Sequence, residues 1–405
     1  MASQRNLLCI ELTSLRRSFM LCSVFIFSQV AVFSGILIGA NAAKLPWIVA
    51  AANQDGVHYT TIAHQGYTYE KDRPSNVAFF PLYPMLCYAV ARLFDLSEMA
   101  SGLIVANTLF PFAVLLMFIY ADLITYHESQ LLSDPDGERC VRFAVMLFIL
   151  LPTGIFFRLV YSESLFAVLF AAYLVSIRRN GSPWTVAILS AFASACRPVG
   201  VALAIGACMH AWRQFGLNLL KLAGVFAVSI SGLLAFAIYQ WYQFGDPAAF
   251  FRTQSLWRLR ENHGVWDKVV SLLTLEPLWA TYLPSSEYYW KNVDVTFPLF
   301  SAQWANPIVL VVTTALIVIG TVSRRLGSIE SVVCISMITI AYWTRAYEMA
   351  CNSQARFCLV VLPAYAVAGY HLSRFRPALV FVVLSILWFL LFVFSVRFAA
   401  GKPIF

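Results

Sequence analysis

The chain has 405 residues, of which 60% are hydrophobic and 12% are charged, and its formal net charge is +8. A soluble domain carries about 25% charged residues, so this chain has too little polar surface to cover itself in water, and we expect an integral membrane protein. The Lys and Arg residues are spread over short segments between apolar runs, which argues against a nucleic-acid partner.

Eleven apolar runs are long enough, or almost long enough, to cross a bilayer. The first run is longer than the ~7–15 residues of a signal-peptide core, so we expect an uncleaved span. Several later runs are shorter than the ~20 residues that an upright helix needs, which allows for half-spans or broken helices. The runs are 18–42, 101–124, 141–157, 162–178, 183–196, 199–213, 220–241, 306–322, 329–345, 357–371 and 377–397. No linker or repeat divides them, so residues 1–405 are expected to form one all-α, polytopic transmembrane domain.

The positions of Lys and Arg predict how these spans are oriented. Basic residues precede the first run and mark later short loops, and cytoplasmic loops carry such an excess. All of these loops fall on one side only if the apolar piece 79–94 does not cross the membrane. Its two prolines and Arg92 favour a helix lying in the outer interface, with a short span as the alternative. The long intervals 43–100 and 242–305 then lie on the outer face, where we expect the chemistry.

The first outer interval contains three candidate functional residues. Asp55 is followed by His58 and Tyr59, which lie on the same side of one helical turn. Asp55 is either a helix N-cap, because Asp before VHYTTIA would cap well, or a carboxylate in a functional site.

Three more charged residues stand at the outer ends of apolar runs, where a charge is costly and marks a candidate site. Glu163 lies between two serines, so it either stabilises a capped first helical turn or faces a polar cavity. Arg197 stands at a Pro-Gly break and suits an anion such as phosphate, or pairs with a carboxylate inside the bundle. Arg356 has the same character, and Arg158 and Arg345 are weaker examples.

The second outer interval begins with a turn at Asp246 and continues with a Trp- and Tyr-rich segment between 257 and 290. These rings form an aromatic belt at the headgroup level or stack on a sugar. The histidines are scattered without metal-ligand spacing, and no nucleotide-binding loop is present, so no cofactor is implied. A disulfide is conceivable only between Cys351 and Cys358, which flank a polar turn.

Six short motifs follow one another along the chain. They are D-x-x-x-Y-x-x-I-A-x-x-G-Y from Asp55, F-F-P-L-Y-P from Phe79, Y-S-E-S-L-F from Tyr161, R-P-x-G from Arg197, G-D-P-x-x-F-x-x-x-Q from Gly245 to Gln254, and A-R-F around Arg356. In this order they resemble the PIG-V-like family of GT-C membrane glycosyltransferases. One departure is Gln54, which stands where the family commonly has an aromatic residue before the Asp.

The resemblance implies an inverting sugar transferase. Such an enzyme takes a sugar from a polyprenyl-phosphate monosaccharide, usually dolichyl-phosphate mannose in eukaryotes, and passes it to a hydroxyl of a glycolipid, glycan or protein. The reaction takes place on the lumenal face of the endoplasmic reticulum, or on the outer face of the plasma membrane in bacteria. Asp55 matches the position of the essential acidic residue that the family carries in its first outer loop.

The chemistry of the reaction suggests roles for these residues. Displacement at an anomeric carbon needs a base for the attacking proton and stabilisation of the departing phosphate, and a divalent metal is compatible with this but not required. We expect Asp55 to be the base or to orient the acceptor, and Arg197 and Arg356 to contact the phosphate. The expected substrate-binding residues are His58, Tyr59, Tyr161, Glu163, Arg197, Asp246, Gln254 and Arg356, with no metal ligand. The alternatives are a multi-span transporter, a GT-C transferase for another sugar, and a scaffold subunit without activity.

Overall fold

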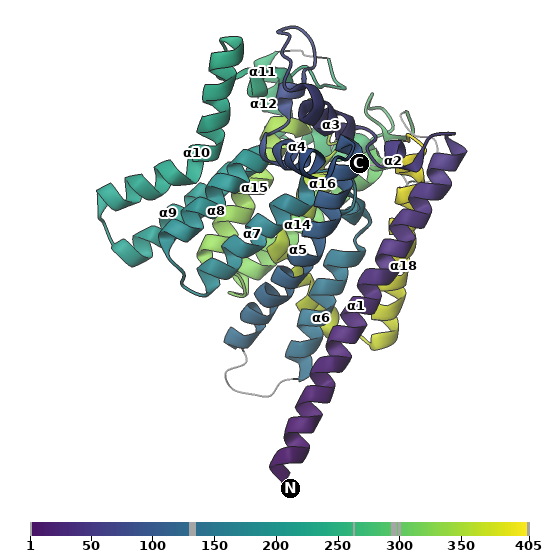
Figure 1. Ribbon diagram of the computed structural model, residues 1–405, viewed down its shortest axis with the longest axis vertical. Helices are drawn as coiled ribbons and strands as arrows, with labels where there is room; N and C mark the ends of the chain where they lie inside the picture. The colour runs from purple at the N-terminus through teal and green to yellow at the C-terminus, as the bar shows by residue number, and fades with distance from the viewer. Residues whose placement is uncertain (1, 129–134, 262–263, 293–297, 299–300, 403–405) are drawn as a thin grey trace.

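The computed structural model describes residues 2–128, 135–261, 264–292, 298 and 301–402 (Figure 1). Within these ranges the chain is helical throughout and contains no strand. The prediction of an all-α protein is therefore confirmed.

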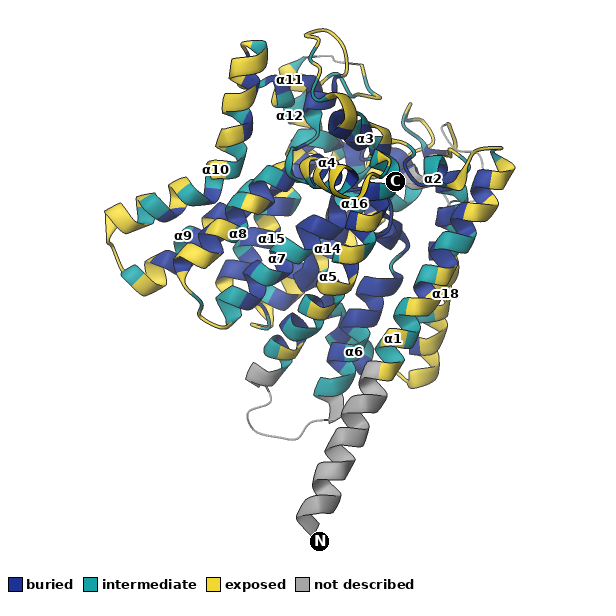
Figure 2. Cartoon of the chain, viewed as in Figure 1, coloured by how far each residue is buried: buried dark blue, intermediate teal, exposed yellow. Residues whose placement is uncertain are grey.

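Among the described residues, five helices are long and apolar enough to cross a membrane. They are α1 (Ala2–Ala42), α5 (Glu98–Glu128), α10 (Leu219–Phe244), α14 (Ala302–Val322) and α18 (Pro377–Ala399). Large apolar side chains are exposed along α10 and α18, as on Ile238 and Phe381, and these helices are largely yellow or teal in Figure 2. Such exposure is expected of surfaces that face lipid rather than water.

Six further predicted spans correspond to shorter helices. They are α6 (Pro135–Leu150), α7 (Glu163–Arg178), α8 (Pro183–Cys196), α9 (Ala202–Phe215), α15 (Ser328–Ala341) and α17 (Leu362–Ser373). Helices of 12 to 16 residues rise only ~18–24 Å at ~1.5 Å per residue, which is less than the ~30 Å of a bilayer core. The total of about eleven spans thus stays a prediction.

Three of the predicted runs are not single helices. Run 141–157 ends as an α-helix at Leu150 and continues as the 3₁₀ helix η2 (Pro152–Phe157), because Pro152 lacks an N–H and holds the preceding residue extended. Run 329–345 passes from α15 into the π-helix η7 (Tyr342–Ala346). Run 357–371 is divided between α16 (Gln354–Leu359) and α17. The broken ends meet, because α16 packs against both η2 and η7.

Short helices gather at one end of the bundle, opposite the N-terminus (Figure 1). They include α2 (Trp47–Ala50), α3 (Asp55–Gln65), α4 (Leu82–Phe94), α11 (Ala249–Gln254), α12 (Val265–Leu273) and α16. The two long polar intervals therefore lie together, as the loop charges predicted. Helix α4 begins at Leu82, after Pro81, so the predicted interfacial helix is shorter than 79–94. It lies across this end of the bundle, and its place in the membrane interface stays a prediction.

The core lies between α5, α6 and α7, of which α6 and α7 are mostly dark blue in Figure 2. Three rings on α5, α6 and η2 pack there, with Phe148 4.8 Å from Phe157 and Phe110 5.0 Å from Phe157. Arg158 is fully buried beside them, 4.4 Å from the Phe110 ring. Its guanidinium donates to Gln29, to Ser28 and to two main-chain carbonyls, so Arg158 is a structural clamp rather than a ligand-binding residue.

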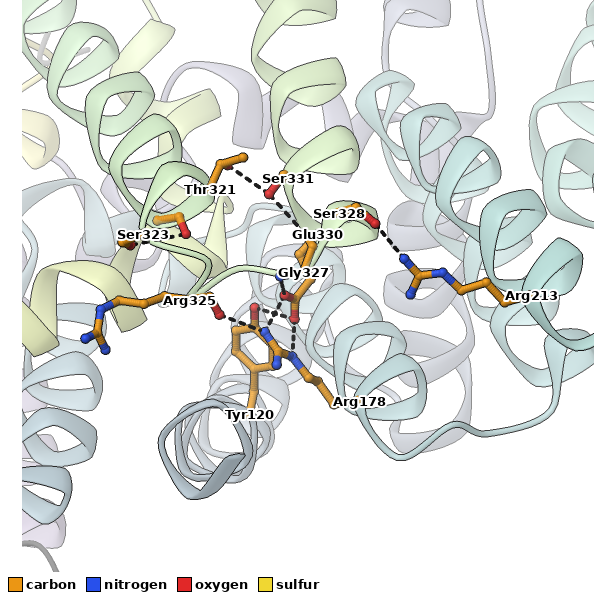
Figure 3. A network of polar contacts seen from close by, with 11 residues as sticks. Tyr120, Arg178, Arg213, Thr321, Ser323, Arg325, Gly327, Ser328, Glu330 and Ser331 are labelled. Carbon is orange, nitrogen blue, oxygen red and sulfur yellow. Dashed lines mark hydrogen bonds and ion pairs between the residues drawn. The ribbon is translucent and has the colours of Figure 1, made fainter. Parts of the chain in front are cut away.

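A polar network closes the opposite end of the bundle (Figure 3). Glu330, at the start of α15, accepts hydrogen bonds from Arg178 at 2.6 and 2.5 Å and from the Tyr120 hydroxyl at 3.0 Å. Nearby, Arg213 on α9 donates to Ser328 at 2.6 Å. The structure thus brings Arg178, Arg213 and Arg325 of three predicted cytoplasmic loops to one end (Figure 3).

Candidate active site

A cavity of about 480 Å³ opens among the short helices at the polar end. Its walls come from α3, from the loop before α4, from the turn after α8, from α11, and from the segment between α15 and α16. Five of the predicted site residues line it: Asp55, Tyr59, Arg197, Gln254 and Arg356. The volume falls within the ~300–1,000 Å³ that is usual for small-molecule sites.

Four of the predicted charged residues are joined by consecutive ion pairs beside this cavity, and we call them the charge cluster. Arg356 Nη1 lies 2.5 Å from Asp55 Oδ2, and Arg356 Nε lies 2.9 Å from Glu163 Oε1. Arg197 Nη1 lies 2.6 Å from the same Glu163 oxygen. Residues that are 301 positions apart in sequence are therefore in direct contact. These four side chains carry two negative and two positive charges, so the charge cluster is neutral as a whole.

The side chains of this charge cluster differ in exposure and in the geometry of their hydrogen bonds. Glu163 is 0% exposed, whereas the Asp55 side chain is 29% exposed, so Asp55 is the carboxylate that a bound molecule can reach. The contacts of Glu163 meet the distance of an ion pair, yet neither of its oxygens has a well-directed hydrogen bond within the described residues. Glu163 is thus held mainly by charge, between two guanidinium groups.

Asp55 does not act as a helix N-cap. It is the first residue of α3, and the N-cap position is taken by Gln54 in a left-handed conformation with φ of 57°. The Asp55 carboxylate bonds instead to Arg356. Burial raises the pKa of Asp55, but the charge and hydrogen bond of Arg356 outweigh it, so the pKa lies below its usual value of 3.8. Asp55 is therefore ionised at neutral pH.

Two buried tyrosines lie next to the charged residues. Tyr59 and Tyr161 are both buried, and the Tyr59 hydroxyl lies 2.9 Å from the Ser162 hydroxyl. Tyr161 donates to the Asn53 carbonyl at 3.0 Å, and its ring lies 5.3 Å from the Arg356 guanidinium. Tyr161 thus fixes the chain just before α3 and also packs against Arg356.

His58 lies one turn after Asp55, in an aromatic setting. Its ring stacks on Phe79 at 4.7 Å and meets the edge of Trp257 at 4.9 Å. Burial lowers the pKa of His58, and the nearby Asp55 charge opposes this only in part. A neutral imidazole packed between rings is the expected state at neutral pH.

The last two predicted residues hold the second outer interval in place. Asp246 Oδ2 accepts hydrogen bonds from Tyr69 at 3.1 Å and from Arg252 at 2.9 Å, and Asp246 does not line the cavity. Gln254 does line it, and its side chain donates to the Ala78 carbonyl at 3.3 Å. These contacts join the loop before α4 to the region around α11.

Sequence reasoning underrated one charged residue and missed three others in the cavity wall. Arg345 was ranked below the other arginines, and Arg252, Lys268 and Glu348 were not considered. The nearest sequence signal for Arg252 and Lys268 is the aromatic density of the second outer interval, whereas Glu348 lies in the turn after run 329–345. No pattern announces the π-helix that carries Arg345.

The structure also bears on a metal site and on the disulfide considered from the sequence. Within the described residues, no three His, Cys, Asp or Glu side chains gather as a metal site requires. Cys351 and Cys358 are both free thiols, so the disulfide considered from the sequence is not formed.

Comparison with known proteins gives the chain its family. The family described as Mannosyltransferase (PIG-V) matches residues 26–245, which are 220 of the 405 residues. The chain belongs to the PIG-V mannosyltransferase family. The predicted resemblance is thereby confirmed, and the matched PIG-V region contains Asp55, His58, Tyr59, Tyr161, Glu163 and Arg197. Three predicted residues lie beyond it, namely Asp246, Gln254 and Arg356.

Two curated relatives carry the name GPI alpha-1,6-mannosyltransferase 2. The human protein is 29% identical over 205 residues, and the protein from Cricetulus griseus is 31% identical over 206 residues. Each match covers 47% of this PIG-V family chain and 39% of the relative, so the chain spans about two fifths of the length of these proteins.

Solved structures were compared in the same way. Two crystal structures of the Archaeoglobus fulgidus oligosaccharyltransferase, one tethered with an acceptor peptide and one in the apo form, align with TM-scores of 0.44. They are 10% and 12% identical to this PIG-V family chain and cover 93% of it, and the alignment takes in 55% and 56% of their own length.

Proposed function

We propose that the protein is a membrane hexosyltransferase, most specifically a mannosyltransferase, that uses a polyprenyl-phosphate monosaccharide as its donor. The observation that carries this proposal is the partly exposed carboxylate of Asp55 at the wall of a cavity, within a chain of the PIG-V family. A transfer reaction at an anomeric carbon needs such a group beside the acceptor hydroxyl. Dolichyl-phosphate mannose is the donor in eukaryotes under this proposal.

Asp55 would orient the acceptor hydroxyl and take its proton. The carboxylate is ionised and held at 2.5 Å by Arg356, which makes it a weak base with a fixed direction. Such a base accepts the proton late, once the attacking oxygen has bonded to the sugar and become acidic. Arg356 and Arg197 would stabilise charge around the site, and Glu163 would keep both guanidinium groups in place.

The cavity walls fit an amphiphilic donor. Aromatic side chains such as Phe79, Phe251 and Trp343 line the cavity together with basic ones such as Arg345. A sugar joined to a lipid through one phosphate presents the same combination of groups. Because a monophosphate leaving group carries less charge than a diphosphate, cationic side chains can stabilise it without a metal.

The membrane setting of the proposal follows from the polar end of the bundle. The chain would be a single domain of GT-C architecture with about eleven spans, and its site would face the lumen or the outer side. The membrane is that of the endoplasmic reticulum in a eukaryote and the plasma membrane in a bacterium. The acceptor class is a glycolipid, a glycan or a protein hydroxyl, and the names of the curated relatives favour a GPI glycolipid. Membership of this family counts against the transporter alternative.

Replacement of Asp55 tests the proposal. Sugar transfer from dolichyl-phosphate mannose, and from the glucose analogue, should be measured with the full chain in lipid. We expect Asp55→Asn to lower turnover by about 100-fold or more, since a positioned base contributes about 10²–10⁴-fold. Asp72→Asn is the matched control, because Asp72 is an exposed acid of the same interval. Wild-type turnover in folded Asp55→Asn protein would remove Asp55 from the mechanism.

A further inference from the structure

The charge around the cavity is unbalanced. Seven ionisable acidic and basic side chains line it, of which five are basic and two are acidic. The basic residues are Arg197, Arg252, Lys268, Arg345 and Arg356, and the acidic residues are Asp55 and Glu348. A cavity with an excess of cations in a membrane protein is expected to receive an anion.

Four of the five cations already have a carboxylate partner. Arg197 pairs with Glu163 at 2.6 Å, Arg356 pairs with Asp55 at 2.5 Å, and Arg252 pairs with Asp246 at 2.9 Å. Lys268 pairs with Glu348. Two of these contacts occupy Arg197 and Arg356, the charges that the sequence had assigned to a phosphate.

Arg345 is different from the other four. Its Nη1 donates to the main-chain carbonyl of Gln254 at 2.8 Å, and within the described residues no carboxylate lies in ion-pair distance of it. A carbonyl satisfies one of five guanidinium N–H groups, and the charges of Asp55 and Glu348 act on Arg345 without an ion-pair contact. Arg345 is thus the cavity-lining cation whose charge is available to a ligand.

The backbone presents Arg345 on an unusual and well-fixed element. The residue lies in the π-helix η7, a wider turn that is rare and is often found at functional sites. The segment that follows holds three non-glycine residues, Ala350, Cys351 and Ser353, in the left-handed region with φ of 46°, 64° and 68°. Backbone in such conformations costs free energy and is concentrated at functional sites.

Contacts from the second outer interval hold this segment in place. The main-chain N–H groups of Leu259 and Arg260 donate to the Glu348 carbonyl at 2.8 and 3.2 Å. Arg260 lies over the rings of Tyr288 and Tyr347 at 4.1 and 4.5 Å, and its guanidinium binds both oxygens of Glu276. A rigid support of this kind preorganises a binding group and lowers the cost of ordering it.

We propose that Arg345 binds the anionic phosphate of a lipid-linked ligand, while Arg197 and Arg356 keep the two carboxylates in position. The inference rests on the proposed function and deepens it. Apolar side chains such as Phe251 and Trp343 line the cavity with Arg345, and they suit the hydrocarbon attached to the phosphate. Arg345 also lies close enough to Asp55 to lower its pKa, after the larger effects of burial and Arg356, so the phosphate would sit beside the proposed base.

Binding of a polyprenyl monophosphate without a sugar tests this inference apart from catalysis. The probes are citronellyl phosphate, the corresponding alcohol citronellol, and inorganic phosphate, each titrated against the purified full chain. We expect Arg345→Gln to weaken binding of citronellyl phosphate by about tenfold to 100-fold, the loss that a charged hydrogen-bond donor typically causes. Arg345→Lys should recover part of the loss, because it restores the charge without the planar fork.

Arg258→Gln is the matched control, because Arg258 is an exposed arginine of the second outer interval that does not line the cavity. It should bind citronellyl phosphate as the wild type does, and thermal unfolding should show that all variants are folded. Unchanged binding by Arg345→Gln, or an equal loss in Arg258→Gln, would overturn the inference. Equal affinity for inorganic phosphate and citronellyl phosphate would overturn the lipid part of it.

The two proposals fail in different ways. Sugar transfer by the wild type, together with lipid-phosphate binding that does not depend on Arg345, would sink the inference and leave the proposed function standing. Binding that depends on Arg345 without transfer of any sugar would do the reverse. A wild type that neither binds the lipid phosphate nor transfers sugar would contradict both.

Discussion

At the scale of single residues, Glu163 holds the site together electrostatically. It is 0% exposed and carries one negative charge between Arg197 and Arg356. Both guanidinium groups are themselves largely buried, with 6% and 12% of their side chains exposed. A carboxylate in this position is needed because two like charges in a low-dielectric interior repel each other and lose their hydration.

Glu163→Gln should therefore destabilise the protein by about 3–5 kcal/mol, the usual cost of removing one partner of a buried ion pair. The measurement is the shift of the thermal unfolding midpoint in detergent, with the free energy taken from chemical denaturation where it is reversible. The double variant Glu163→Gln with Arg197→Met removes one charge of each sign and should recover a large part of the loss. A double variant that is as unstable as the sum of the two single variants would contradict the coupling.

The sequence identified the members of this cluster but not their pairing. Glu163, Arg197 and Arg356 were each recognisable as costly charges at the outer ends of apolar runs, and Asp55 as an acid of the first outer interval. For Asp55 the sequence also allowed an N-cap, and for Arg197 it allowed either a phosphate or a carboxylate partner. These alternatives depend on contacts between residues as far as 301 positions apart, which no local spacing encodes.

At the scale of helices and turns, the ends of the short helices place the charges. Arg197 is the last residue before the 3₁₀ turn η3 (Pro198–Val201), which joins α8 to α9. The Gly200 N–H donates to the Arg197 carbonyl at 2.9 Å, and Gly200 packs against the backbone of α8. A Cβ atom at position 200 would lie only 2.2 Å from the Ala193 carbonyl oxygen.

Gly200→Ala should consequently displace η3 and loosen the pairing of Arg197 with Glu163. Overpacking of this kind costs about 1–3 kcal/mol, and misplaced site residues lower turnover by about tenfold to 100-fold. Thermal unfolding and sugar transfer are the two measurements. Gly224→Ala on α10 is the control, because its Cβ would meet only the end of the Trp184 ring at 3.0 Å. Equal behaviour of the two variants would show that the close approach at Gly200 is not needed.

The same elements show where hydropathy stops being informative. All eleven apolar runs contain helix, because apolar stretches in a membrane must satisfy their backbone hydrogen bonds internally. The breaks at Pro152 and between α16 and α17 lie inside apolar runs, and η7 begins inside one. Pro152 could have signalled the first break, whereas the π-helix follows from tertiary packing. Since Arg345 lies on that π-helix, its importance was hidden for the same reason.

At the scale of the whole molecule, the two ends of the bundle differ in kind. The short helices, the cavity and the charge cluster lie at one end, and the basic turns around Arg178 and Glu330 lie at the other (Figures 1 and 3). The short loops with an excess of Lys and Arg normally face the cytoplasm. This arrangement requires α4 not to span the membrane, and α4 does lie across the end of the bundle rather than along it (Figure 1).

Single cysteines introduced at exposed positions should report this orientation. Lys71→Cys lies in the first polar interval, Lys402→Cys follows α18, and Arg179→Cys lies in the turn after α7. In intact cells or sealed vesicles of known orientation, a membrane-impermeant maleimide should label the first two from the outer or lumenal side. Arg179→Cys should react only from the cytoplasmic side, because α7 separates that turn from the cavity. The parent protein gives the background, since the one exposed thiol among its described cysteines, Cys22, lies within the first candidate span. Labelling of Lys71→Cys and Lys402→Cys from opposite sides would mean that an odd number of segments between them crosses the bilayer. That result would contradict the structure, in which the Gln54 side chain donates to the Lys402 carbonyl at 3.4 Å.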